Sequence, residues 1–226
     1  MEWSPQDAMK AYLQTLHLNK VVSYGDNRLE TRKSSVIEPK CMELISALAA
    51  GKRAKLIVEI TTQGITPLTV ALGVAAKQSG GQLICIVVGN GKGKGKRNYY
   101  YNYSIKAKAL EHAIKLVVAG NPCEFLMQLK KIDFAVIDCK FEDYLKLFTN
   151  LDVNLTSSTV IVRNVDQYQR NKGGTVSYGQ AVKRSKGIGS VTLPIGDGIE
   201  LTRIGSSSTF SRGRRRHRRF HVTFEN

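Results

Sequence analysis

Short runs of valine, isoleucine and leucine alternate with helical stretches along most of this chain, and this alternation limits the folds open to it. The clearest runs are residues 55–60, 83–88, 114–118, 133–138 and 159–162. Apolar runs of this length without strict polar alternation are typical of strands covered on both faces. Apolar residues at helical spacing lie between them, as in 42–49 and 68–75. The pattern predicts an α/β fold, with a mostly parallel sheet and helices on both faces.

The two ends of the chain depart from this alternation. Ser4 and Pro5 have the pattern of a helix start, with serine as the cap and proline at the first helical position. The polar stretch from about Asn19 to Val36 lacks periodicity and is expected to be a loop. Near the other end, 190–193 and 199–204 alternate around a Pro/Gly-rich turn and predict an antiparallel pair.

The length of 226 residues suits one domain. We expect this domain to span residues 1–204, with an N-terminal helix and loop in 1–37, and to be followed by a basic tail in 205–226. Further helices are expected from Ser104 to about His112, from Pro122 to about Leu129, and from about Glu142 to Leu147.

The formal net charge of +16 is concentrated in two short segments. Ten of the basic residues are Lys92, Lys94, Lys96 and Arg97 in the first segment, and Arg212, Arg214, Arg215, Arg216, Arg218 and Arg219 in the second. Charge focused in this way favours an anionic partner, such as nucleic acid, a phosphorylated ligand or an acidic membrane surface.

Each basic segment admits more than one interpretation. The glycines and lysines of 89–97 are suited to receiving a phosphate, and the tyrosines between 99 and 103 are suited to stacking on nucleic-acid bases. A solvated insertion is the alternative. The arginines of 212–219 have the composition of a nuclear import signal or of an RNA or phosphate contact, with a solvated tail as the alternative.

The cysteines and the hydropathy of the chain indicate in which cellular compartment the protein is expected. The four cysteines form no C-x-x-C pair and lie in apolar runs, as expected for reduced thiols in an intracellular protein. The first fifteen residues lack an apolar signal core, and no run approaches the roughly 18–20 apolar residues of a membrane span. We therefore expect a cytoplasmic or nuclear protein without a membrane span.

Three segments, LIVEITTQGIT (56–66), DFAVID (133–138) and LPIGDGIEL (193–201), occur in this order. They resemble motifs of class I S-adenosylmethionine-dependent methyltransferases of the caffeoyl-coenzyme A O-methyltransferase type. Glu59 and Gly64 match the first motif, roughly L-E-I-G-x-x-x-G-x-S, while Thr61 replaces its first glycine. The resemblance implies a Rossmann-like sheet of seven strands with a C-terminal antiparallel hairpin. The opening Trp3-Ser4-Pro5, with Ala11-Tyr12, is similar to a plant family of unknown function placed with these enzymes by fold.

The same resemblance implies a site for S-adenosylmethionine. The turn containing Thr61, Gly64 and Thr66 would face the methionine end, where glycine lets the backbone approach a ligand closely. Glu59 would lie beneath it, as an acid that needs a partner at a buried strand end. Asn90 would lie near the ribose, where related folds carry an acid, so weak binding is expected. Gly120 and Asn121 would lie near the adenine, or form only a turn.

Asp138 stands where the metal-dependent members of that family have their first carboxylate ligand. Their next ligands are an Asp-Asn pair after the following strand, and this chain has Arg163-Asn164 there. Because an arginine would repel a divalent cation, we expect no catalytic metal, with an Asp138–Arg163 salt bridge as the alternative role. The histidines and cysteines also lack the spacing of zinc ligands.

Three functions remain open at this point. The first is a methyltransferase of small molecules or of an anionic substrate. The second is a methyltransferase-like domain without catalysis, kept as a binding or regulatory module. The third is an RNA-associated protein that uses its two basic segments. The missing ribose acid and the arginine at 163 favour the second over the first.

Overall fold

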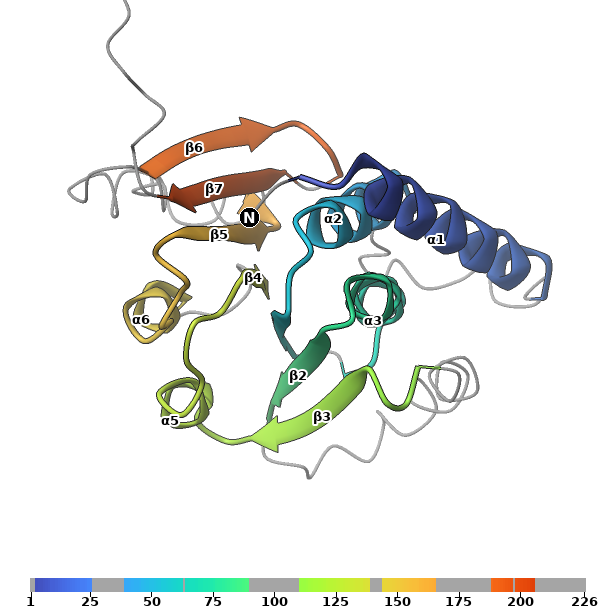
Figure 1. Ribbon diagram of the computed structural model, residues 1–226. Coiled ribbons are helices and arrows are strands. Elements are labelled where there is room, and N and C mark those ends of the chain that lie inside the picture. Colours follow the sequence, from blue (N-terminus) through green and yellow to red (C-terminus); the bar gives the residue numbers. More distant parts are fainter. Residues whose placement is uncertain are drawn as a thin grey trace, which may run out of the picture.

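Seven strands form one sheet in the part of the chain that the computed structural model describes. That part comprises residues 3–25, 39–62, 64–89, 110–138, 144–165, 188–196 and 198–205. The strands are β1 (Leu56–Thr61), β2 (Gln82–Val88), β3 (Ile114–Ala119), β4 (Phe134–Asp138), β5 (Ser157–Arg163), β6 (Ile188–Leu193) and β7 (Ile199–Gly205). Their order across the sheet is β3-β2-β1-β4-β5-β7-β6 (Figure 1).

The first five strands run parallel to one another, and the last two are antiparallel. Strand β1 pairs with β2 on one side and β4 on the other, and β5 continues the parallel sheet. Strand β7 lies between β5 and β6 and is antiparallel to both. The predicted fold class is therefore confirmed, including the mostly parallel seven-stranded sheet and the antiparallel pair at its C-terminal end.

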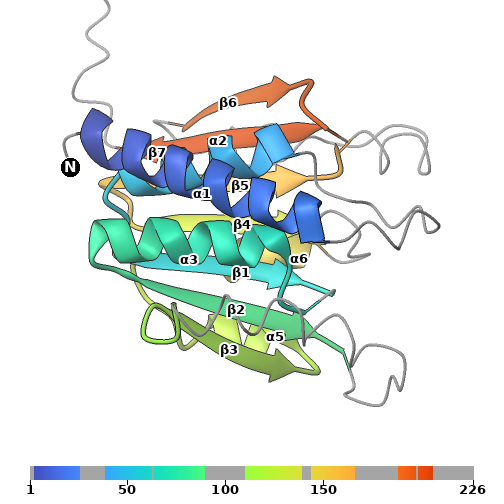
Figure 2. The ribbon, with the colours of Figure 1, turned by 90° about the vertical axis from the view of Figure 1, so that its right-hand side faces the viewer.

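Helices cover both faces of the sheet. One face carries α1 (Pro5–Gly25), α2 (Pro39–Gly51) and α3 (Pro67–Ser79), and the other carries the short helices α5 (Pro122–Leu126) and α6 (Tyr144–Thr149) (Figures 1 and 2). Among the helices within the described ranges, none is long and apolar enough to cross a membrane.

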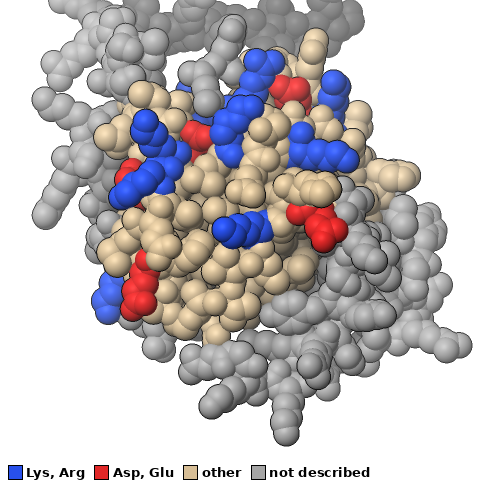
Figure 3. Space-filling view, turned by 60° about the horizontal axis from the view of Figure 1, so that its bottom comes forward, with Lys and Arg blue, Asp and Glu red and all other residues tan. Residues whose placement is uncertain are grey.

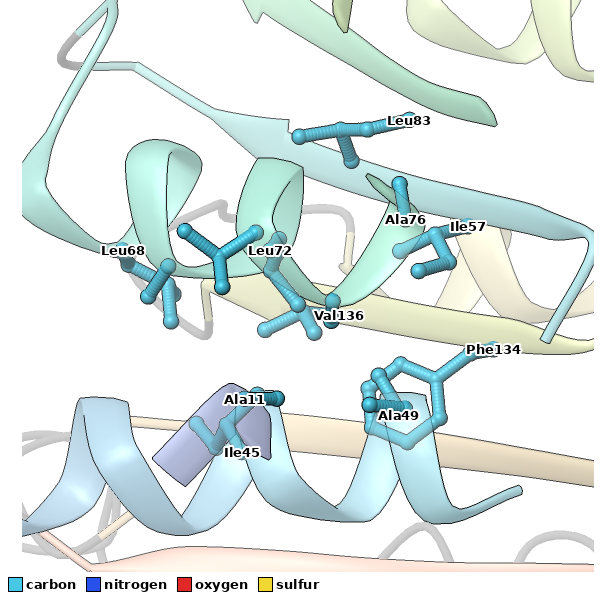
Figure 4. Packing of buried hydrophobic residues seen from close by; sticks show 14 of the residues in the cluster. Ala11, Ile45, Ala49, Ile57, Leu68, Leu72, Ala76, Leu83, Phe134 and Val136 are labelled. Atoms are coloured by element: carbon cyan, nitrogen blue, oxygen red, sulfur yellow. The ribbon is translucent and has the colours of Figure 1, made fainter. Parts of the chain in front are cut away.

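The larger part of the core lies between the sheet and helices α2 and α3. Ile57 and Phe134 point from the sheet toward this layer, where they meet Ile45 and Ala49 of α2 and Leu72 of α3 (Figure 4). All five side chains are fully buried. Alternate strand residues fill a second cluster on the opposite face, as expected for a sheet covered on both sides.

Helix α1 docks on the end of α2 through its first residues. The indole of Trp3 lies over Gly51, so closely that a Cβ on that glycine would come within 2.4 Å of the ring. The Ser4 amide donates a hydrogen bond to the Gly51 carbonyl at 2.7 Å. Arg53 pairs with Asp7 at 3.0 Å. The serine–proline start of α1 therefore also positions the helix.

Several predicted boundaries were wrong. Residues 19–25 belong to α1, which continues to Gly25, because no glycine or proline stops the helix before that point. Helix α5 ends at Leu126, with Met127 as its C-cap, so 127–129 are not helical. Helix α6 runs to Thr149. Of the helix predicted for 104–112, the described end is a turn in which the Ala113 amide donates to the Leu110 carbonyl at 2.8 Å.

Asp133, which the sequence placed inside a strand, immediately precedes β4, and its side chain accepts hydrogen bonds from two neighbouring segments. Its Oδ2 accepts hydrogen bonds from the amides of Lys55 and Leu56 at 2.8 and 3.2 Å. Its Oδ1 accepts one from Asn154 at 2.9 Å. This buried carboxylate therefore ties the start of β1 to the start of β4. These partners lie at the edge of the sheet where the parallel strands begin.

Candidate functional site

The parallel strands place most of the predicted site residues along one edge of the sheet, which we call the carboxyl edge. The turn after β1 contains Thr61, Gly64 and Thr66, and β4 ends at Asp138. Gly120 and Asn121 follow the end of β3. Because the carboxyl ends of parallel strands meet at one edge, these residues from separate segments are brought to the same side of the molecule (Figure 2).

The turn between β1 and α3 is held by its own hydrogen bonds. Gly64 has a φ of +80°, which a residue with a Cβ rarely adopts. Thr66 caps α3: its hydroxyl accepts from the Thr69 amide at 3.3 Å, and the Thr66 amide donates to the Thr69 hydroxyl at 2.9 Å. Pro67 then starts the helix. The Thr66 hydroxyl is therefore engaged in this cap.

Glu59 is the most unusual group near this turn. It is only 2% exposed, and neither of its carboxyl oxygens has a hydrogen-bond partner among the described residues. On β1 it is separated from Ile57 by one residue, so its side chain lies on the α3 side of the sheet. Its neighbours in register are Cys85 of β2 and Val136 of β4.

Burial raises the pKa of the Glu59 carboxyl from 4.5 to about 7, because an ionised carboxylate loses its hydration there. The Thr69 hydroxyl and the Arg163 guanidinium act in the opposite direction and lower this pKa. Burial likewise raises the pKa of the Cys85 thiol, so this cysteine is an inert neutral group. The site thus holds an acid whose ionised form is disfavoured by burial.

Asp138 and Asn164 form a buried polar pair at the ends of β4 and β5. The Asn164 side-chain amide donates a hydrogen bond to Asp138 Oδ1 at 2.6 Å, and both residues are 4% exposed. Asn164 has a φ of +61°, a conformation that asparagine tolerates better than most residues. Arg163 lies directly opposite Asp138 in register. One hydrogen bond to Asp138 therefore comes from Asn164, the residue after the arginine that the salt-bridge interpretation invoked.

Glu59, Asp138 and Arg163 lie on the same face of the sheet, since each falls two residues after a member of the core cluster beneath α2 and α3. Their charges act on one another: Arg163 lowers the pKa of Glu59 and Asp138 raises it. Within the described ranges, no three histidine, cysteine, aspartate or glutamate side chains gather as a metal site.

At the ends of β2 and β3 the carboxyl edge consists of glycines and an asparagine in the described residues. A Cβ added to Gly89, just after β2, would meet no atom of the described residues within 4 Å. Asn121 caps α5 by accepting from the Cys123 amide at 3.1 Å, and it donates to Glu124 at 2.8 Å. Gly120 and Asn121 are both exposed, which fits the turn interpretation as well as a ligand contact. Asn90 lies outside the described residues.

Both basic segments also lie outside the described residues, and their binding of polyanions stays a prediction. The described body has no comparable concentration of charge on the face that contains α5 and β3, where lysine and arginine alternate with acidic side chains (Figure 3). The ion pairs of the described residues include that of Lys130 with Asp152, at 3.2 Å.

Sequence reasoning missed Cys85 and Thr69 as neighbours of Glu59. Both are small groups in apolar runs, and their position depends on strand register and on how α3 packs. The threonine three residues after Thr66 was the only available signal, as part of a capping pattern.

Comparison with known proteins identifies the fold and a family. A family model described as "Protein of unknown function (DUF1442)" matches residues 1–225. A search of curated proteins gives no match.

Several solved structures resemble this chain over most of its length. An O-methyltransferase from Bacillus cereus in complex with SAH is 14% identical, with a TM-score of 0.59, covering 89% of this chain and 98% of that one. The O-methyltransferase TomG from Streptomyces achromogenes, involved in tomaymycin synthesis and in complex with SAM, is 15% identical, with a TM-score of 0.57 and coverages of 89% and 96%. A methyltransferase from Geobacter sulfurreducens is 16% identical, with a TM-score of 0.55 and coverages of 85% and 89%. The chain therefore has the Rossmann-like methyltransferase fold.

Proposed function

The chain belongs to the DUF1442 family of proteins of unknown function, and we propose that it is a metal-independent methyltransferase that binds S-adenosylmethionine at the carboxyl edge of its sheet. The observation that carries the proposal is Glu59, a buried acid without a described partner beneath the turn that opens α3. Buried polar groups are nearly always paired in folded proteins, so an unpaired carboxyl at this place is best explained by a ligand.

The residues at this edge suit the chemistry of that cofactor. Glu59 offers a negative charge and two acceptors to a positively charged ligand, and such a ligand would draw its pKa down and ionise it fully. The positive φ of Gly64, and the absence of described atoms within 4 Å of a Cβ at Gly89, allow a ligand to approach the backbone there. We assign cofactor contacts to Glu59 and the 61–66 turn, with Asn90, Gly120, Asn121 and Asp138 around the remainder.

The bound cofactor would supply an electrophilic methyl group, and the protein would orient the acceptor. Arg163 is a cationic side chain of this edge in the described part of the chain, half-buried and opposite Asp138 in register. A guanidinium is suited to hold an anionic oxygen with two parallel hydrogen bonds. We therefore assign Arg163 to the acceptor side of the site, in the role that a divalent ion has in metal-dependent relatives of the caffeoyl-coenzyme A type.

Calorimetric titration with S-adenosylmethionine and S-adenosylhomocysteine tests the proposal. We expect saturable binding of both ligands, and we expect Glu59→Gln to weaken it roughly tenfold to a hundredfold, because a hydrogen bond to a charged group contributes about 1.5–3 kcal/mol. Glu200→Gln is the matched control. Glu200 is also buried, but it accepts from Ser190 at 2.7 Å in the antiparallel part of the sheet.

Ligand binding by the wild type tests the proposed function, and the effect of Glu59→Gln tests the role of Glu59 in it. If the folded wild-type protein binds neither ligand, the proposed function is wrong. If both ligands bind and Glu59→Gln has no more effect than Glu200→Gln, the cofactor site stands without Glu59.

If the protein needs no metal, its affinity for divalent ions at the ends of β4 and β5 should be weak. We expect no tight, stoichiometric binding of Mg²⁺ or Ca²⁺ to the wild-type protein, since the Arg163 guanidinium repels a cation beside Asp138. Arg163→Asp is expected to create divalent-ion affinity by adding a carboxylate to Asp138 and Asn164. Isothermal titration measures both, and Arg163→Gln controls for loss of charge alone. Tight binding by the wild type that disappears in Asp138→Ala would contradict the prediction.

A catalytically inactive binding module is the second candidate, favoured by the absence of an acid directly after β2. Incubation with methyl-labelled cofactor and acceptors of different classes, including phenols, carboxylates and RNA, distinguishes the two. Transfer of label to any acceptor supports the enzyme. Cofactor binding without transfer to any of them supports the module.

A further inference from the structure

A second group of polar side chains lies at the opposite edge of the sheet, which we call the amino edge. Lys52 follows the end of α2, Thr159 lies near the start of β5, and Arg203 lies near the end of the antiparallel β7. Thr159 and Arg203 are directly opposite each other in register, so their side chains share a face of the sheet. That face is the one covered by α2.

Lys52 is buried at this edge, and no acidic side chain of the described ranges forms an ion pair with it. It is 8% exposed, and its ammonium donates to the Thr159 hydroxyl at 3.0 Å. An ammonium has three N–H donors, and the described structure gives the other two no acceptor. Burial, together with the charge of Arg203, lowers the pKa of Lys52 to about 8. The Lys52 ammonium, which burial leaves poorly hydrated, is therefore held near the charge of Arg203.

Asp133, the acid that acts on the pKa of Lys52, and Asp7, which pairs with the residue after Lys52, are already used by other groups. Asp133 raises the pKa of Lys52 from a distance, but its two oxygens accept from the amides of Lys55 and Leu56 and from Asn154. Asp7 is paired with Arg53. Within the described residues, neither Lys52 nor Arg203 takes part in an ion pair. Buried Lys52 and exposed Arg203 are thus both without an acidic side-chain partner among the described residues.

The strand surface beside Arg203 is open in the described part of the chain. Gly189 of β6 is its partner in register, and a Cβ added to that glycine would meet no atom within 4 Å. Strand β7 ends at this edge with Gly205. The second basic segment begins seven residues later, at Arg212.

We propose that Lys52, Thr159 and Arg203 form a binding site for a phosphate group at the amino edge, separate from the proposed cofactor site. A phosphate can carry two negative charges and so can pair with both cations, whereas a carboxylate carries one. The guanidinium offers paired donors, the ammonium a point charge and the hydroxyl one donor. The phosphate belongs either to a free phosphate compound or to a nucleic-acid backbone that also meets the arginines of 212–219.

The test follows Lys52 itself, since the basic segments would bind phosphate elsewhere. In full-length protein containing ¹³C-labelled lysine, the titration of Lys52 is followed by NMR and assigned with Lys52→Met. We expect saturating inorganic phosphate to raise the pKa of Lys52 by about one unit, since a nearby opposite charge favours the ammonium. Sodium chloride at equal ionic strength is the control, and exposed Lys115 is the reference lysine.

Arg203→Gln separates a built site from general screening. Without phosphate, this variant should raise the pKa of Lys52, because Arg203 lowers it in the wild type. With phosphate, it should show a much smaller further increase than the wild type. The proposal is overturned if phosphate leaves Lys52 unchanged, shifts Lys115 equally, or acts as strongly in Arg203→Gln.

The source of the phosphate is decided with a single-stranded RNA oligonucleotide. If the site takes a nucleic-acid backbone, the oligonucleotide shifts Lys52 at a lower concentration than inorganic phosphate does. Replacing the six arginines of 212–219 by glutamine then removes that advantage. If the site takes a free phosphate compound, inorganic phosphate acts alone and the arginine substitutions have no effect on Lys52.

Discussion

Replacement of Glu59 by leucine is expected to stabilise the protein while it weakens binding of S-adenosylhomocysteine. Glu59 is almost fully buried and neither carboxyl oxygen has a described hydrogen-bond partner, so the folded state bears a loss of hydration that the nearby Thr69 hydroxyl and Arg163 guanidinium offset only in part. A leucine of similar size removes this cost. We expect the free energy of unfolding at pH 7.5 to rise by roughly 3 kcal/mol, measured by denaturant titration.

Ser158→Ala is the matched control for this gain. The Ser158 hydroxyl is also buried without a described partner, but it lies near the start of β5, away from the carboxyl edge. Its replacement should stabilise the protein without changing ligand binding. A destabilised Glu59→Leu protein would mean that the carboxyl is paired in the native state, and the ligand argument would lose its main support.

The same carboxyl makes stability depend on pH in a defined window. Its pKa is raised from 4.5 to about 7, so between these values the folded protein keeps a proton that the unfolded chain releases. Stability therefore falls as the pH rises through this window, by about 3 kcal/mol from this group, and levels off above it. Comparing wild type with Glu59→Leu at pH 5 and 7.5 isolates the contribution. A difference that does not grow with pH would contradict it.

Gly81→Ala is expected to destabilise the fold by roughly 3 kcal/mol, because the added methyl group has no room. A Cβ at Gly81 would lie 2.5 Å from the Ala54 carbonyl oxygen and 2.7 Å from that of Lys55. These are backbone atoms, and the Lys55 carbonyl also accepts from the Gln82 amide at 2.8 Å. The methyl group can be accommodated only if the start of the β1–β2 pairing opens.

Thermal unfolding measures this cost, with a fall in Tm of roughly 6–12 °C expected for a chain of this size. Gly189→Ala is the control, since a Cβ there meets nothing within 4 Å. An equal change in both variants would show that glycine content rather than the close contact sets the stability.

The sheet could be predicted because its strands carry their own signal. Ile57–Ile60, apart from Glu59, and Phe134–Ile137 are apolar runs whose residues are buried on both faces of the sheet, so register was not needed to find them. The end of α1 could not be predicted, because Lys20 to Tyr24 have no periodic pattern and the helix ends only at Gly25. The antiparallel pair was predicted, but its order was not: β7 pairs with β5 on one side and β6 on the other.

The candidate site was predictable only in part, for a related reason. Glu59 and Gly64 stand in a local motif, and the sequence places both at the end of β1. The contacts of Asp138 with Asn164 and of Lys52 with Thr159 join residues 26 and 107 positions apart. Such pairs depend on register and helix packing, which no single segment encodes.

The position of Trp3 gives the protein an optical reporter. It is the single tryptophan of the chain, and its ring lies on Gly51 while 49% of the residue remains exposed. Its fluorescence therefore responds to the docking of α1 on α2, whereas far-ultraviolet circular dichroism follows all the helices and strands together. If α1 detaches before the sheet unfolds, the two signals will change at different denaturant concentrations, and local opening becomes measurable without any added dye.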